Sequence, residues 1–318
     1  MYFENMSENT VNPGNTEKMI AWYGFTMTVP QDWDIGAFSG NYDNGYLRID
    51  DRFSVKLGIK WQTFKKKPNL RLVVDNFIKR IVKQFKFGKK AKPEFGAIRW
   101  IDDTQWTGVE QIGFKIVHLK KTHLKFEGVG FHCSGCNKTV VCQLYYTQEE
   151  QPLMLKVIRS LRDHVQGDKA PWAILDFHAD IPKEFRLDNC EVKSAFLQMN
   201  FSAGKAKLRI ARWGLADVLL RKMPFYDWSK GVMKSLYHEL AEKAVQVDFR
   251  GHQAVELLNY KPVKKSFLSK GQPEESLNIK LWYCPEINRI FLTEIRVDGN
   301  DGIAGKFMEQ VRVVCHEQ

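Results

Sequence analysis

Residues 25–33 read FTMTVPQDW, and residues 177–185 read FHADIPKEF. In both stretches apolar and polar side chains alternate up to a proline, and an aromatic residue follows three positions later. Alternation with a period of two is typical of a strand with one buried face, and proline ends a strand because it has no N–H to donate. The two stretches lie 152 residues apart, so the sequence predicts a strand that occurs twice in an internal repeat.

The correspondence continues along both halves of the chain. Lys60-Trp61 and Arg212-Trp213 each end an alternating stretch at the same offset, and Phe131-His-Cys133 matches Trp282-Tyr-Cys284 at an offset of 151. Between these pairs, apolar residues recur every fourth position, which predicts one amphipathic helix in each half. These helical positions are Val73, Phe77, Ile81 and Phe85 in the first half, and Val232, Leu236 and Leu240 in the second.

The order of elements predicts the fold class. Each half reads as three strands, the amphipathic helix, a meander of strands, and a closing helix near 150–164 or 301–314. Strands and helices that do not alternate strictly indicate an α+β fold with a mainly antiparallel sheet. We therefore predict two tandem, similar domains. The expected division is a disordered, tag-like N-terminus (1–17), a first repeat (18–165), a linker (166–171) and a second repeat (172–318).

The stretch Thr28-Val-Pro-Gln-Asp-Trp33, with this order of elements around it, resembles the PsbP-like fold. That fold is shared by the extrinsic PsbP proteins of photosystem II and the Ran-binding Mog proteins. The resemblance covers residues 22–164 and again 172–315, and it implies a non-enzymatic binding or adaptor protein. It assigns no site residue, because no binding motif of the family maps onto this chain. A tandem pair also departs from the single-domain members, so their partners are not carried over.

The net charge of +11 is concentrated in one segment. Residues 56–92 hold thirteen Lys or Arg and a single acid, Asp75. Helical spacing places several of these cations on one face of the first amphipathic helix, opposite its apolar stripe. The helix expected at about 226–244 carries mixed charges instead, so the fold itself does not require the basic face. The candidate binding residues are Lys65, Lys66, Lys67, Lys79, Arg80, Lys83, Lys86, Lys89 and Lys90.

A basic face of this kind fits an acidic protein surface or nucleic acid, and the alternative is a merely solvated face. The predominance of Lys over Arg favours non-specific phosphate contact over base recognition. Phe77 and Phe85 are expected on the buried side, where they cannot stack on bases, whereas Phe64 and Phe87 are free to do so. A membrane surface is not favoured, because the helix directs its apolar side to the core.

No local motif of catalysis is present. The sequence lacks Gly-rich nucleotide loops, the Gly-x-Ser-x-Gly nucleophile motif and the His-Glu-x-x-His zinc motif. We therefore expect a binding protein without a cofactor rather than an enzyme. Two alternatives stay open: an enzyme with a site in the groove between the domains, and a non-specific nucleic-acid-binding protein.

Residues 132–138 read HCSGCNK, and Cys133 and Cys136 have the spacing of half a zinc site. Zinc takes four ligands. The neighbouring candidates either lie too far from the two cysteines along the expected hairpins or point to the other face of the strand. Those candidates are His118, His123, His132 and Cys142, which leaves only Cys190, Cys284, Cys315, His316 or a second chain. In the second copy the stretch aligns with residues 283–289, where Ile287 replaces Cys136. We therefore expect a turn rather than a metal site.

Neither a membrane span nor a secretory leader is expected from the sequence. No apolar run approaches the roughly 18 residues of a membrane span, and no secretory leader is recognisable. Six unevenly spaced cysteines do not form a disulfide framework. We expect a cytoplasmic protein, and the sequence leaves its oligomeric state open.

Overall fold

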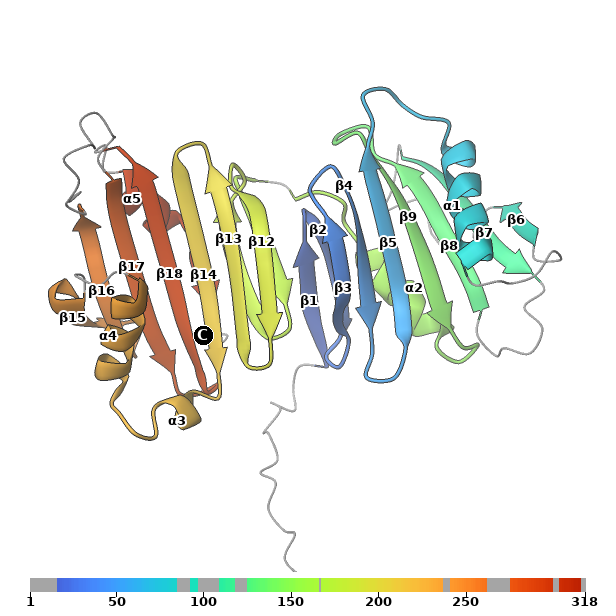
Figure 1. Cartoon of the computed structure of the whole chain (residues 1–318). Coiled ribbons are helices and arrows are strands. Elements are labelled where there is room, and N and C mark those ends of the chain that lie inside the picture. Colours follow the sequence, from blue (N-terminus) through green and yellow to red (C-terminus); the bar gives the residue numbers. More distant parts are fainter. Residues whose placement is uncertain are drawn as a thin grey trace, which may run out of the picture. The chain divides into compact units, whose positions relative to one another are not determined.

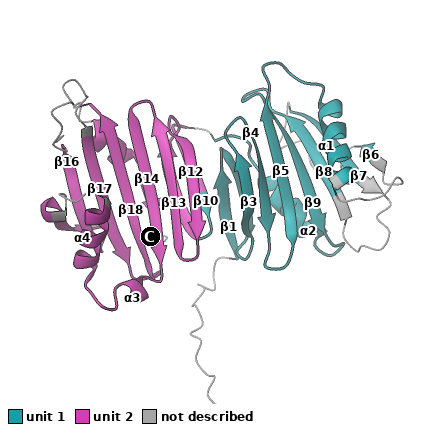
Figure 2. Cartoon of the chain, in the orientation of Figure 1, with its two compact units in different colours: residues 1–165, 173–175 teal, residues 166–172, 176–318 magenta. Residues whose placement is uncertain are grey.

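The computed structural model describes residues 16–84, 92–96, 109–117, 125–165, 167–236, 241–261, 275–299 and 303–315. Within these residues the protein is mixed α/β and mainly β, with three antiparallel sheets and five α-helices. The chain divides into two compact units (Figure 2). Unit 1 comprises residues 1–165 and 173–175, and unit 2 comprises residues 166–172 and 176–318.

Unit 1 is built on a seven-stranded sheet with a helix on each face. In order of pairing the strands are β3 (Asp34–Gly40), β4 (Asn44–Asp50), β5 (Val55–Thr63), β9 (Lys138–Tyr146), β8 (Lys125–His132), β7 (Glu110–Val117) and β6 (Lys92–Gly96). Helix α1 (Leu70–Gln84) packs against β7, β8 and β9. Helix α2 (Gln151–Ser160) lies behind the sheet in the view of Figure 1 and also contacts the hairpin of β1 (Glu17–Trp22) and β2 (Phe25–Pro30).

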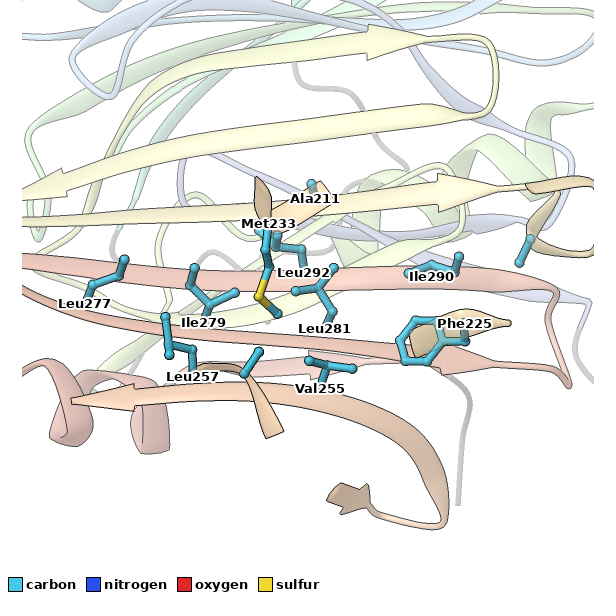
Figure 3. Packing of buried hydrophobic residues seen from close by; sticks show 12 residues of the cluster. Ala211, Phe225, Met233, Val255, Leu257, Leu277, Ile279, Leu281, Ile290 and Leu292 are labelled. Carbon is cyan, nitrogen blue, oxygen red and sulfur yellow. The ribbon is translucent and has the colours of Figure 1, made fainter. Parts of the chain in front are cut away.

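Unit 2 has a second seven-stranded sheet. Its strands in order of pairing are β12 (Arg186–Lys193), β13 (Phe196–Ala203), β14 (Ala206–Gly214), β18 (Arg289–Asp298), β17 (Glu275–Cys284), β16 (His252–Tyr260) and β15 (Val245–Phe249). The other elements assigned mainly to this unit are β10 (Lys169–Ile174), β11 (Phe177–Pro182), β19 (Arg312–Val314), α3 (Ala216–Leu219), α4 (Phe225–Leu236), α5 (Ile303–Gln310) and the 3₁₀ helix η1 (Ala241–Lys243). Met233 of α4 packs among the buried Ile279, Leu281 and Leu292 (Figure 3).

The two sheets have the same strand order. The series β3-β4-β5-β9-β8-β7-β6 in unit 1 corresponds to β12-β13-β14-β18-β17-β16-β15 in unit 2. The two stretches that opened the sequence comparison form β2 and β11, as predicted. Phe131 pairs with Val140 and Trp282 pairs with Phe291, which preserves the expected offset of 151.

One part of the sequence comparison is wrong. Lys60 pairs with Val141, and Ala211 pairs with Leu292, so Lys60 corresponds to Ala211 and not to Arg212. The chain from Ile49 to its partner Leu57 is one residue longer than the chain from Phe201 to its partner Leu208, which shifts the offset from 152 to 151. A shift of one residue turns every side chain to the opposite face of a sheet, so the matching Lys60-Trp61 and Arg212-Trp213 pairs face different ways.

The closing helices are shorter than expected. Helix α2 ends at Ser160, and α5 ends at Gln310. The chain then turns back to the sheet, because its main-chain groups find partners there: Val314 of β19 pairs with His178, and Arg162 forms the corresponding bridge to Thr26 in unit 1. Part of the expected linker is also ordered, since β10 begins at residue 169.

Candidate anion-binding site

Helix α1 does bury one face, but the buried stripe is offset from the expected one. The fully buried side chains are Leu70, Val74, Ile78 and Ile81. Val73 and Phe77, which were expected in the core, are only half-buried, and Phe85 lies outside the described residues. The expectation failed because Leu70 begins a second i, i+4 series that packs on Phe114 and Val141. Phe77 is therefore available at the surface, contrary to the argument from sequence.

The predicted cations that the structure describes are all exposed. These are Lys65, Lys66, Lys67, Lys79, Arg80 and Lys83, whereas Lys86, Lys89 and Lys90 lie outside the described residues. Lys65 to Lys67 follow β5, and the other three belong to α1. The structure thus gathers two groups of basic side chains around the start and the outer face of one helix.

Acidic neighbours interrupt this basic surface. The amino group of Lys67 lies 2.6 Å from the carboxylate of Glu110, and that of Lys79 lies 2.5 Å from Asp75 one helical turn earlier. Both lysine side chains are about two-thirds exposed, so each pair contributes only about 0.2–1 kcal/mol to stability. The pairs nevertheless reduce the local positive potential. They divide the basic surface into separate patches.

A pocket of about 240 Å³ opens between α1 and the sheet, beside one of these patches. Its lining residues are Lys60, Trp61, Gln62, Phe64, Val73, Asn76, Phe77, Arg80, Thr139 and Val141. Lys60 pairs with Val141 and Gln62 pairs with Thr139, so these four side chains project from the same face of the sheet. The pocket therefore has a mixed floor from β5 and β9, and a wall formed by one turn of α1.

Two cations border the pocket. Partial burial of Lys60 lowers its pKa, and the positive charge of Arg80 lowers that pKa further. Within the described part of the chain, neither Lys60 nor Arg80 has an ion-pair partner. Two mutually repelling cations beside apolar walls are an arrangement that an anion would stabilise, because it would attract both charges and end their repulsion.

The same place in unit 2 is filled. The counterparts of Lys60, Gln62 and Thr139 are Ala211, Trp213 and Ile290, which belong to or pack against the apolar cluster of Figure 3. The Trp213 ring lies 5.4 Å from the ring of Trp228 on α4, in an edge-on arrangement. This strand order and helix position are therefore compatible with a closed, apolar interface. Unit 1 replaces that interface with polar side chains and leaves a cavity.

Sequence reasoning counted Lys60 in the basic segment but did not identify it as a site residue. It also missed Gln62 and Thr139, because their role depends on which face of the sheet they occupy. The available signal was the offset of 151 that holds around Phe131. Extending that offset back to β5 would have matched Gln62 with Trp213 and shown a loss of apolar volume.

The structure confirms that residues 134–136 form a turn. Asn137 and Asn288 both have left-handed backbone, with φ of +56° and +55°, which asparagine tolerates. Cys142 pairs with Val129, as expected, and is directed away from the turn. The argument against four metal ligands is wrong, however, because Asp163 and His164 lie beside the two turn cysteines. Sequence reasoning missed both residues by placing them inside the closing helix.

Within the described residues, no helix is long and apolar enough to cross a membrane. No model of a protein family matches the chain, and no curated protein matches it. Among solved structures, the chain is similar to a chain of "The crystal structure of Tle4-Tli4 complex", with 9% sequence identity and a TM-score of 0.34. The match covers 95% of this chain and 99% of the other. A likeness at that TM-score carries no functional argument.

Proposed function

We propose that the protein is a non-enzymatic binding module, and that the pocket of unit 1 receives an acidic segment of a partner protein. One observation carries the proposal. The place that Trp213 and Trp228 fill in unit 2 is an open pocket in unit 1, bordered by Lys60 and Arg80, and neither cation has an ion-pair partner among the described residues. A cavity costs stability relative to a filled core, so a cavity with charged borders is expected to have a use.

The lining of the pocket indicates the kind of side chain that fits. A carboxylate between Lys60 and Arg80 would accept charge-assisted hydrogen bonds from both. The apolar atoms of Val73, Phe77 and Val141 would then contact an apolar or aromatic residue next to the acid in the partner. The preferred ligand is therefore a short segment that combines a glutamate or aspartate with an aromatic neighbour.

The charge pattern favours a protein partner over nucleic acid. A protein that follows a phosphate backbone needs a continuous series of cations. Here Glu110 and Asp75 neutralise Lys67 and Lys79, and the Arg71 guanidinium stacks 3.5 Å above the ring of Phe95. Lys60 and Arg80 at the pocket form a local anion site, which suits a single carboxylate better than a polymer of phosphates.

We also propose that the two units are copies of one template, of the PsbP-like kind that the sequence resembles. The shared strand order and the constant offset between paired positions support this. Under this proposal unit 2 keeps the template's filled interface, and unit 1 carries the binding function. The comparison supplies an internal control for experiments on the pocket.

A binding titration tests the function directly. The probe is a fluorescently labelled random copolymer of glutamate and tyrosine, with polyglutamate of the same length and single-stranded DNA as comparisons. We expect the purified chain to bind the copolymer more tightly than polyglutamate. The double variant Lys60→Glu/Arg80→Glu should weaken copolymer binding by roughly tenfold, or about 1–2 kcal/mol, because two attractions become repulsions.

The matched control is Lys65→Glu/Lys66→Glu, which changes the net charge equally on exposed residues that do not line the pocket. It should weaken binding by less than threefold or so, as long-range screening implies. Equal losses in the two double variants would refute the pocket and indicate diffuse polyanion binding. Preference for DNA over the copolymer would replace the protein partner with nucleic acid.

A further inference from the structure

A second group of side chains in unit 1 has the composition of a metal centre. Cys133 and Cys136 belong to the turn between β8 and β9, and Asp163 and His164 belong to the segment that follows α2. One ligand atom from each of these four residues lies within 4.8 Å of all the others. The group lies outside the anion pocket, whose lining includes none of the four.

The four side chains contact one another in a series from Cys136 through Asp163 and His164 to Cys133. The Cys136 thiol donates a hydrogen bond to Asp163 Oδ2 at 3.0 Å, and His164 Nδ1 lies 3.0 Å from Asp163 Oδ1. The same histidine nitrogen lies 3.6 Å from Cys133 Sγ. A Cβ at Gly135 would lie 3.7 Å from that sulfur and 3.8 Å from the imidazole ring. The absence of a side chain at this position lets the ring approach the turn closely.

The backbone of the turn is held by hydrogen bonds around one left-handed residue, Asn137. The N–H of Cys133 donates to the carbonyl of Lys138 at 2.9 Å, which closes the turn. The left-handed Asn137 then directs the N–H of Lys138 toward the sulfur of Cys136. In a metal site the same N–H would donate to the coordinating sulfur of Cys136.

We propose that unit 1 binds one Zn²⁺ ion, and that its ligands are Cys133, Cys136, Asp163 and His164. Two thiolates, an imidazole and a carboxylate are ligands that zinc accepts in tetrahedral geometry. With Zn–S bonds of about 2.3 Å and Zn–N or Zn–O bonds of about 2.0–2.1 Å, tetrahedral ligands lie roughly 3.3–3.8 Å apart. The observed separations, all within 4.8 Å, need to contract by no more than about 1.5 Å in the widest case.

The site is structural rather than catalytic, because protein side chains supply all four positions. The ion would fasten the end of α2 to the turn between β8 and β9. Binding would release the thiol protons and would stabilise the folded unit by the free energy of metal binding.

Unit 2 supports the position and explains why the site belongs to unit 1. Cys284 corresponds to Cys133 at the offset of 151. Arg162 and Val314 form matching pairings, so Cys315 corresponds to Asp163. Together with His252, Cys284 and Cys315 form a group of three donors, with Cys315 Sγ 3.4 Å from His252 Nε2. The corner between this turn and the segment after the closing helix thus gathers metal-binding side chains twice. Ile287 stands where unit 1 has Cys136, so unit 2 lacks the second cysteine of the turn.

Metal content and competition titrations test the proposal. The full chain is reduced, dialysed free of metal, and titrated with ZnCl₂ against a chromophoric chelator, and Co²⁺ is used to detect thiolate-to-metal charge transfer. We expect one tight equivalent and a cobalt spectrum typical of a tetrahedral site. Cys136→Ile should abolish that equivalent and the cobalt band. His164→Asn, at an exposed position, should weaken zinc binding at least about tenfold and keep the fold intact.

Two controls separate the alternatives. Cys190→Ser removes a thiol that belongs to neither group, and Cys284→Ala removes the counterpart in unit 2, and both should retain the tight equivalent. Circular dichroism of each variant reports whether it folds. Retention of zinc by folded Cys136→Ile, or loss of zinc in Cys284→Ala alone, would overturn the assignment. A Cys133–Cys136 disulfide that persists in the metal-free chain after treatment with a reductant would also overturn it.

Discussion

Lys56 offers a test in which the loss of folding stability and the sign of its pH dependence both follow from the structure. Its amino group lies 3.0 Å from the carboxylate of Asp51 and 2.6 Å from that of Glu150, the residue just before α2. Only 7% of the Lys56 side chain is exposed, compared with 13% for Asp51 and 32% for Glu150. The ion pair thus fixes the first turn of α2 to the loop between β4 and β5.

The substitution Lys56→Met keeps the apolar stem and removes the charge. Removing one member of a buried ion pair costs about 3–5 kcal/mol, because the other member remains buried without a partner. Glu150 is nearly one-third exposed, and water screens part of that cost. We therefore expect the free energy of unfolding of unit 1 to fall by about 2–3 kcal/mol at pH 7.

In Lys56→Met, the contribution of these carboxyls to the pH dependence of the free energy of unfolding should change sign. Burial acts to raise the pKa of Asp51 and of Glu150, but hydrogen bonds from Lys56 and from backbone N–H groups lower both pKa values overall. Carboxyls with a lowered folded pKa stabilise the protein above their unfolded pKa values of about 4, and this contribution is lost as the pH falls further. Without Lys56, burial and mutual repulsion would raise the folded pKa of Glu150 above its unfolded value. The variant should then become more stable as the pH is lowered from 7 to 5.

Urea unfolding at pH 7, 6 and 5 measures both effects, and hydrogen exchange of the α2 amides localises them. The control is Lys65→Met, an exposed lysine in the same unit, which should leave stability within about 0.5 kcal/mol of the parent. A loss below about 1 kcal/mol at pH 7, or a variant whose stability does not rise toward pH 5, would refute this account of the ion pair.

Two further substitutions use the comparison between the units. Gln62→Trp introduces the side chain that fills the equivalent place in unit 2. It should raise the free energy of unfolding in urea by about 1 kcal/mol and weaken copolymer binding at least about tenfold. Unchanged binding would show that the ligand does not enter the pocket. Asp176→Asn removes the carboxylate that lies 2.5 Å from the buried Arg212 and 2.7 Å from Arg289. Because Asp176 is 42% exposed, we expect a loss of about 1–2 kcal/mol confined to the unfolding of unit 2, and the exposed Asp188→Asn serves as control.

Much of the fold could be predicted from sequence because its strongest signals are local. The alternation in residues 25–30 and 177–182, each ended by proline, locates two strands correctly. The offset of 151 around Cys133 and Cys284 predicts the matching turns, because the pattern of a strand or a turn spans only a few consecutive residues. Helix ends were less accurate, since residues 161–164 have a helical composition but Arg162 exchanges backbone hydrogen bonds with Thr26 of β2.

The sites could be predicted only in part, because they depend on register and on contacts distant in sequence. The basic residues were identifiable from composition, but the pocket depends on which face of β5 carries Lys60 and Gln62. A shift of one residue between β4 and β5 decides this, and periodicity alone does not fix such a shift. His164 lies 31 residues after Cys133 in the chain, and its proximity to Cys133 likewise follows from where α2 ends.

The short strand β19 has a consequence for association between molecules. It contains only Arg312–Val314, yet it pairs with residues 178–180 of β11 and so covers that edge. Short edge strands with an exposed charge, such as Arg312, are poor templates for further strand pairing. A chain that stopped before Arg312 would present the open main-chain groups of β11 to other molecules. Loss of these few residues is therefore expected to promote edge-to-edge aggregation as well as to destabilise unit 2.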